Sequence, residues 1–103
     1  DGVEDITLPV KQDWAKQAYH LFVIRTNKRN ELQLYLTENN IQTGIHYPIS
    51  LPKLKAYDYL GQANEQMLAN SLDASLLSLP IGEHLTDNDI KYAINTIKLF
   101  YKL

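Results

Sequence analysis

The strongest hydrophobic pattern in the chain lies in residues 19–25, which read Tyr-His-Leu-Phe-Val-Ile-Arg. Successive side chains of a strand point to opposite faces, so Leu21 and Val23 would share one face while Phe22 and Ile24 share the other. Both faces are apolar, which is typical of a strand that is covered on both sides. Because a two-layer domain covers only one face of its sheet, the pattern predicts an apolar surface that needs a partner.

Apolar residues at helical spacing predict three helices further along the chain. Their ridges are Leu32, Tyr35 and Leu36; then Leu68, Leu72 and Leu76; then Ile90, Ala93, Ile94, Ile97 and Tyr101. We expect Asn27, Asn64 and Thr86 to cap the three helices, because these side chains accept hydrogen bonds from the first free N–H groups. Asp89, three residues after Thr86, completes a variant of the capping box.

Alternation in one segment and a short apolar run in another predict two further strands. Residues 41–47 place Ile41, Thr43, Ile45 and Tyr47 on one face and Gln42, Gly44 and His46 on the other. Residues 77–80 form a third short strand, and 6–10 are a possible edge strand because Pro9 cannot donate to a central ladder. The order of elements predicts an α+β, two-layer domain, with a small, largely antiparallel sheet and helices packed on one side. We expect residues 1–17 to be an N-terminal connector and 18–103 the domain proper.

Composition excludes several classes of function. The 103 residues allow one domain, and a net charge of −2 without basic clusters gives no reason to expect a nucleic acid or an anionic membrane as partner. The absence of cysteine excludes disulfides, thiolate metal sites and cysteine nucleophiles. No apolar run is long enough to span a bilayer and no signal peptide is visible, so we expect a cytoplasmic protein. The chain lacks an initiator methionine, which suggests a fragment of a longer protein.

One short segment carries candidate chemistry, namely Ile45-His46-Tyr47-Pro48. His46 would lie beside Gly44 on the open face of its strand, where a ligand can approach, and both His46 and Tyr47 can donate to a phosphate or a sugar hydroxyl. The alternative is an ordinary structural histidine. His20, His46 and His84 lie far apart in the sequence without the spacing of metal ligands, and no phosphate-binding loop or nucleophile motif is present.

Five motifs in the same order make the chain resemble the DegT/DnrJ/StrS family of sugar aminotransferases. The segments are 19–25, 41–48 (Ile-Gln-Thr-Gly-Ile-His-Tyr-Pro), Ala56-Tyr57, 77–80 (Leu-Ser-Leu-Pro) and 86–90 (Thr-Asp-Asn-Asp-Ile). They are similar to the strands, loop and final helix of that family's C-terminal small domain. The likeness spans residues 6 to 101. It departs from the family pattern at Pro52 and Lys55, in the loop that follows the His-Tyr-Pro motif.

The resemblance implies an aspartate-aminotransferase-like parent enzyme of fold type I. Such an enzyme uses pyridoxal phosphate to transfer an amino group, usually from glutamate, to a keto group of a nucleotide-linked sugar. The family's Schiff-base lysine and most cofactor contacts belong to a large N-terminal domain, so this chain is expected to hold no catalytic and no cofactor-binding residue. His46 and Tyr47 match the family's substrate-side loop. The parent is expected to be a homodimer and the fragment alone inactive.

A second hypothesis remains open from the sequence. The chain could be a free-standing α+β module that binds a partner or a small ligand. The coding sequence upstream of Asp1 separates the two hypotheses, because only the enzyme requires a continuous reading frame with a lysine-bearing cofactor domain.

Overall fold

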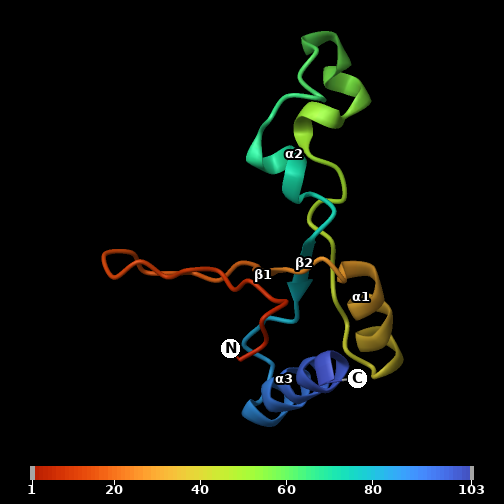
Figure 1. Ribbon diagram of the computed structural model, residues 1–103. Helices are drawn as coiled ribbons and strands as arrows, with labels where there is room; N and C mark the ends of the chain where they lie inside the picture. The colour runs from red at the N-terminus through yellow and green to blue at the C-terminus, as the bar shows by residue number, and fades with distance from the viewer. Residues whose placement is uncertain (1, 103) are drawn as a thin grey trace.

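The computed structural model describes residues 2–102 and contains two strands, three α-helices and two 3-10 helices (Figure 1). In chain order these are β1 (Phe22–Arg25), α1 (Arg29–Glu38), η1 (Leu51–Lys53), η2 (Lys55–Leu60), α2 (Leu68–Leu72), β2 (Leu76–Leu79) and α3 (Asp87–Lys102). No helix of the described residues has the length and apolar character that crossing a membrane requires.

The sheet consists of β1 paired antiparallel with β2, with Ile24 opposite Leu77. A single bridge flanks each edge, from Thr7 to Arg25 on β1 and from Gly44 to Ser78 on β2. The prediction of a strand over 41–47 is therefore wrong, although this segment does run beside β2. Continuing its register beyond Gly44 would pair Gln42 with Pro80, which has no N–H to donate, so the ladder stops. The possible edge strand at 6–10 is likewise reduced to its bridge at Thr7.

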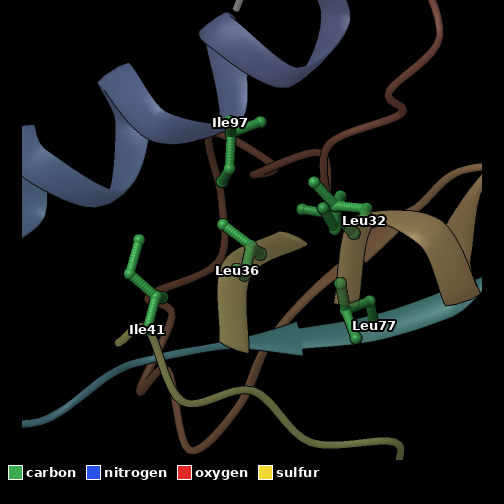
Figure 2. Packing of buried hydrophobic residues seen from close by; sticks show 6 residues of the cluster. Leu32, Leu36, Ile41, Leu77 and Ile97 are labelled. Atoms are coloured by element: carbon green, nitrogen blue, oxygen red, sulfur yellow. The ribbon is translucent and has the colours of Figure 1, made fainter. Parts of the chain in front are cut away.

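The core lies between the sheet and two helices, as Figure 2 shows. Its buried side chains are Ile24, Leu32, Leu36, Ile41, Leu77 and Ile97. These come from both strands, from α1 and α3, and from the segment that follows α1, so α1 and α3 share one face of the sheet. The predicted α+β, two-layer architecture is confirmed. On the other face of β1, Leu21 is 38% exposed, so that apolar face is only partly covered.

The prediction from the sequence is wrong for the start of α1 and correct for its end. Asn27 is not the cap: Lys28 occupies the cap position, and the Thr26 hydroxyl oxygen accepts from the Lys28 N–H at 3.1 Å. The helix ends at Asn39 and Asn40, as expected. Asn40 adopts a φ of 60°, and the Ile41 N–H donates back to the Leu36 carbonyl at 2.8 Å. This is a Schellman ending, and it places Ile41 in the core beside Leu36.

The other two helices differ from prediction in what they bury. The expected cap Asn64 is wrong, because α2 is one short turn that begins after Met67. The side-chain amide of Asn70 donates to the carbonyls of Gln62 and Glu65 in the preceding loop. Leu76 belongs to β2 rather than to α2. In α3 the predicted capping by Thr86 is confirmed. Ile90 and Ile94, expected in the core, are 46% and 45% exposed.

Two segments project away from this core (Figure 1). One is the extended N-terminal stretch of residues 8–20, and the other is an arm of residues 48–75 that carries η1, η2 and α2. The radius of gyration is 15.6 Å, whereas a compact chain of this length would have about 13 Å. The Asp73 carboxylate fastens the arm, because it accepts from the Ser50 N–H at 3.0 Å and from the Lys53 ammonium at 3.0 Å.

Candidate functional site

His46 is held in one orientation by two residues on two segments. Gly44 and Ser78 exchange both backbone hydrogen bonds, at 3.0 and 2.7 Å, and the His46 Nδ1 lies 2.8 Å from the Ser78 hydroxyl oxygen. A Cβ at Gly44 would lie only 2.6 Å from the His46 Cε1, so the absence of a side chain there makes room for the ring. Because Nδ1 is engaged by Ser78, Nε2 is the ring nitrogen left for a ligand.

Tyr47, which follows His46, is exposed to solvent. Its side chain is 74% exposed, and its ring meets the imidazole edge-on with centroids 5.7 Å apart. The peptide between the two residues is cis. Ile45 packs against the core on the opposite side, so the sequence-predicted alternation is correct from Ile41 to Ile45 even though no regular strand forms. The segment thus presents an imidazole and a phenol side by side at the surface.

A hollow of about 440 Å³ opens beside His46, on the sheet face away from the helices. Ser78 points to this face, because its neighbours Leu77 and Leu79 contact the core on the other side. All three histidines of the chain line the hollow: His20, His46 and His84. We refer to it as the histidine hollow. Within residues 2–102 no three His, Asp or Glu side chains are arranged to share a metal ion.

His84 is positioned by the loop between β2 and α3. A Cβ at Gly82 would lie 2.6 Å from the His84 Cε1, which repeats the relation between Gly44 and His46. The loop ends in the capping box, where the Asp89 carboxylate accepts from the Thr86 N–H and hydroxyl, both at 2.8 Å. These hydrogen bonds, with a smaller contribution from the charge of His84, lower the pKa of Asp89 below its usual range.

A second, larger concavity of about 760 Å³ lies on the other side of the same loop. We call it the apolar groove. Its walls come from the N-terminal segment, the sheet and α3, and include Ile6, Phe22, Ile90 and Ile94. The half-exposed ridge of α3 therefore forms a wall of the groove instead of filling the core.

The histidine hollow does not fit covalent attachment of pyridoxal phosphate. That chemistry needs a lysine amine facing a cavity. No lysine lines the histidine hollow, and the Lys53 ammonium is engaged by Asp73 and by the Asn70 carbonyl at 2.7 Å. Lys98 touches the apolar groove, whose lining is mostly apolar and includes the carboxylate residue Asp89.

Comparison with known proteins shows which family the chain belongs to. The model of the DegT/DnrJ/EryC1/StrS aminotransferase family matches residues 1–98, which is nearly the whole chain. The chain belongs to this family. It is 43% identical over 97 residues to the erythromycin biosynthesis sensory transduction protein EryC1 of Saccharopolyspora erythraea, covering 93% of this chain and 26% of that protein. It is 34% identical over 95 residues to dTDP-3-amino-3,6-dideoxy-alpha-D-galactopyranose transaminase of Aneurinibacillus thermoaerophilus, again covering 26% of the relative.

Solved structures agree on the fold. The Streptomyces venezuelae DesV structure in complex with a ketimine intermediate superposes with a TM-score of 0.81 at 31% identity, covering 98% of this chain and 27% of that one. An aminotransferase of the family from Brucella abortus superposes with a TM-score of 0.83 at 22% identity. The chain thus spans about a quarter of the length of its relatives, and the predicted family and fold type I architecture are confirmed.

The sequence motif predicts His46 and Tyr47 as site residues but does not predict their surroundings. Ser78, which fixes the ring, is unremarkable within its strand. The repeated Gly-x-His spacing, at 44–46 and again at 82–84, is the one sequence pattern that could have linked His84 to His46. The three histidines, far apart in the sequence, are brought to one hollow only by the pairing of β2 with β1 and with Gly44.

Proposed function

We propose that this chain is the C-terminal small domain of a pyridoxal-phosphate-dependent aminotransferase that acts on a nucleotide-linked keto-sugar. The observation that carries the proposal is the family match over residues 1–98 in a chain that spans about a quarter of its relatives. Residues 18–103 form the small domain and 1–17 the connector from a large N-terminal domain. The proposed amino donor is glutamate and the proposed compartment is the cytoplasm.

Pyridoxal phosphate is assigned to the rest of that longer protein. A related sugar aminotransferase structure from Streptococcus pneumoniae, 26% identical to this chain, is a PLP form, which supports this cofactor. When bound, the cofactor supplies the electron sink for amino transfer. The residues of this chain serve the substrate, and we expect the 103 residues alone to have no transaminase activity.

His46 and Tyr47 are the proposed substrate contacts. The Nε2 of His46 is free while Nδ1 is engaged by Ser78, and the Tyr47 phenol is exposed beside it. Both groups can hydrogen-bond to phosphate or sugar oxygens, and the tyrosine ring can also stack. Their role is to bind and orient the substrate rather than to form covalent bonds with it.

The exposed surfaces support a domain that packs against other parts of a larger assembly. Val10 is 75% exposed and Trp14 86% exposed on the N-terminal stretch, and Tyr59 is 81% exposed on the arm. Large apolar side chains on projecting segments mark interaction surfaces in soluble proteins. We propose that the large domain and the second subunit of a homodimer cover them. This extended shape disfavours the alternative of a free-standing module.

The test begins with the full-length protein that carries this sequence. We expect it to show the visible absorbance of bound pyridoxal phosphate and to transfer the amino group of glutamate to a nucleotide-linked keto-sugar. The matched control is His46→Ala, which should keep the cofactor absorbance and raise the KM for the sugar substrate. A full-length protein without cofactor absorbance, or a reading frame that begins just before Asp1, would contradict the proposal.

A further inference from the structure

Tyr47 lies between two points at which the chain is fastened to other segments. On one side, His46 is held by the Ser78 hydroxyl. On the other side, the Ser50 N–H donates to the Asp73 carboxylate at 3.0 Å. Because Tyr47 itself is exposed, its orientation depends on how its neighbours along the chain are held.

The second of these fastenings rests on two acceptor residues. Within residues 2–102, every hydrogen bond that leads from residues 48–53 to another segment ends on Asn70 or Asp73. The Ser50 hydroxyl donates to the Asn70 side-chain oxygen at 2.5 Å, and the Lys53 ammonium donates to both residues. The large apolar side chains of this segment are exposed, so packing adds little to these hydrogen bonds.

Asp73 is itself held by residues of α1 and by the chain next to β1. The Arg29 guanidinium, in the first turn of α1, donates to the main-chain carbonyls of Asp73 and Leu76 at 3.3 and 3.4 Å. The Thr26 N–H donates to the Ser75 carbonyl at 2.9 Å. Arg29 and Asp73 are both 9% exposed, so water competes little for these hydrogen bonds. The Asp73 side chain therefore links the outgoing part of the arm to α1 and β1.

A carboxylate suits this position because it can accept several hydrogen bonds at once. Here the two donors are the Ser50 N–H and the Lys53 ammonium, and together they lower the pKa of Asp73 below the ordinary 3.8. The side chain is therefore charged at neutral pH. Hydrogen bonds to a charged group are roughly twice as strong as those between neutral groups.

We propose that Asp73 is a positioning residue for the substrate contact of Tyr47, acting through Ser50 and Lys53. The proposal rests on the proposed function and deepens it. Asp73 does not line the histidine hollow, so it acts without touching the substrate. When this link is lost, the segment after Tyr47 can leave its place, and the tyrosine is oriented for binding only part of the time. The apparent affinity then falls in proportion to the oriented fraction.

The test compares the steady-state kinetics of full-length variants with those of the wild type. Asp73→Ala removes both acceptor oxygens and should raise the KM for the nucleotide-linked sugar about tenfold at unchanged kcat, because only binding is weakened. Asp73→Asn keeps an acceptor for the Ser50 N–H but loses the ion pair, so a smaller rise is expected. Lys53→Met should raise the KM as well, whereas Lys53→Arg, which keeps the charge, should stay close to the wild type.

Two controls separate positioning from a general loss of stability. In a Tyr47→Ala background, Asp73→Ala should add little to the KM, because both changes remove the same substrate contact. Thr86→Ala is the matched stability control, since it removes the cap of α3 outside this network. It should lower the midpoint of thermal unfolding and leave the KM unchanged.

Three results would overturn the proposal. They are an unchanged KM in both Asp73→Asn and Lys53→Met with the fold intact by circular dichroism, an equal rise in Thr86→Ala, and a full additional rise in the Tyr47→Ala background. Amide hydrogen exchange at Ser50 distinguishes this failure from that of the proposed function. Faster exchange in Asp73→Ala, in a protein that transaminates no nucleotide-linked sugar, supports the link to Ser50 and contradicts the proposed function. Unchanged exchange overturns the link.

Discussion

The substitution Gly44→Ala isolates the support of His46 from the rest of the fold. Gly44 does not occupy the left-handed region, so alanine can adopt its backbone conformation, and its two hydrogen bonds to Ser78 use backbone atoms only. The new Cβ would, however, start 2.6 Å from the His46 Cε1. Ordinary contact begins at 3.4 Å, so the ring must move by most of an ångström. The domain should therefore stay folded while the imidazole is displaced.

The size of the effect follows from the bond that the movement breaks. The His46 Nδ1 lies 2.8 Å from the Ser78 hydroxyl oxygen, and an outward shift of that size takes the pair beyond hydrogen-bonding distance. Such a bond contributes about 0.5–1.5 kcal/mol. If substrate binding uses the fixed ring, Gly44→Ala should weaken the affinity for a nucleotide-linked sugar by about two- to tenfold.

A double-mutant cycle with Ser78→Ala provides the assay. Ser78→Ala removes the same hydrogen bond without a steric clash, so the two single variants should lose similar affinity. The double variant should lose little more than either one, because both changes break one interaction. Ring-nitrogen NMR signals of His46 should shift in all three variants. Additive losses, or an unmoved His46 signal in Gly44→Ala, would refute the reasoning.

Three further predictions concern stability. Leu36→Ala removes a fully buried side chain next to the Schellman ending of α1 and should lower the free energy of unfolding by about 2–5 kcal/mol in urea denaturation, whereas the exposed Leu34→Ala should change it little. Thr86→Ala removes the cap of α3 and should cost about 0.5–2 kcal/mol by thermal unfolding; an unchanged midpoint would contradict the capping role. For Asp73, hydrogen bonds from the Ser50 N–H and Lys53 lower its pKa below the ordinary 3.8. Its contribution is therefore complete above that pH and is lost as the pH falls through the lower, folded-state value. Asp73→Asn should be less stable than wild type at neutral pH and converge with it in acid, and a constant difference between the two would count against this ion pair.

The sequence predicts those parts of the fold that depend on local pattern. The capping box at Thr86 and the end of α1 at Asn39 and Asn40 depend on side chains within a few residues of each other, and both are found where expected. The alternation from Ile41 to Ile45 is also correct. The missing strand hydrogen bonds depend on Pro80, a residue far along the chain that takes its place opposite Gln42 only through tertiary pairing.

In the candidate site, too, the sequence predicts what depends on neighbouring residues and does not predict what depends on tertiary contacts. His46 and Tyr47 are apparent from their own motif, because a polar pair follows an apolar alternation and precedes Pro48. Their supports are not apparent, since Ser78 reaches His46 only through the bridge between Gly44 and β2. The exposed positions on α3 also depend on tertiary context, because a helical ridge does not show which part of it another domain covers.

A crystal structure of the full-length protein with a bound nucleotide-linked sugar tests the central claim most directly. The account predicts that the Nε2 of His46 and the hydroxyl of Tyr47 lie within hydrogen-bonding distance, about 3.2 Å, of ligand oxygens. It further predicts that the His46 Nδ1 remains on Ser78 in the complex. A ligand bound elsewhere, with both His46 and Tyr47 still exposed to solvent, would contradict the assignment of this loop to the substrate.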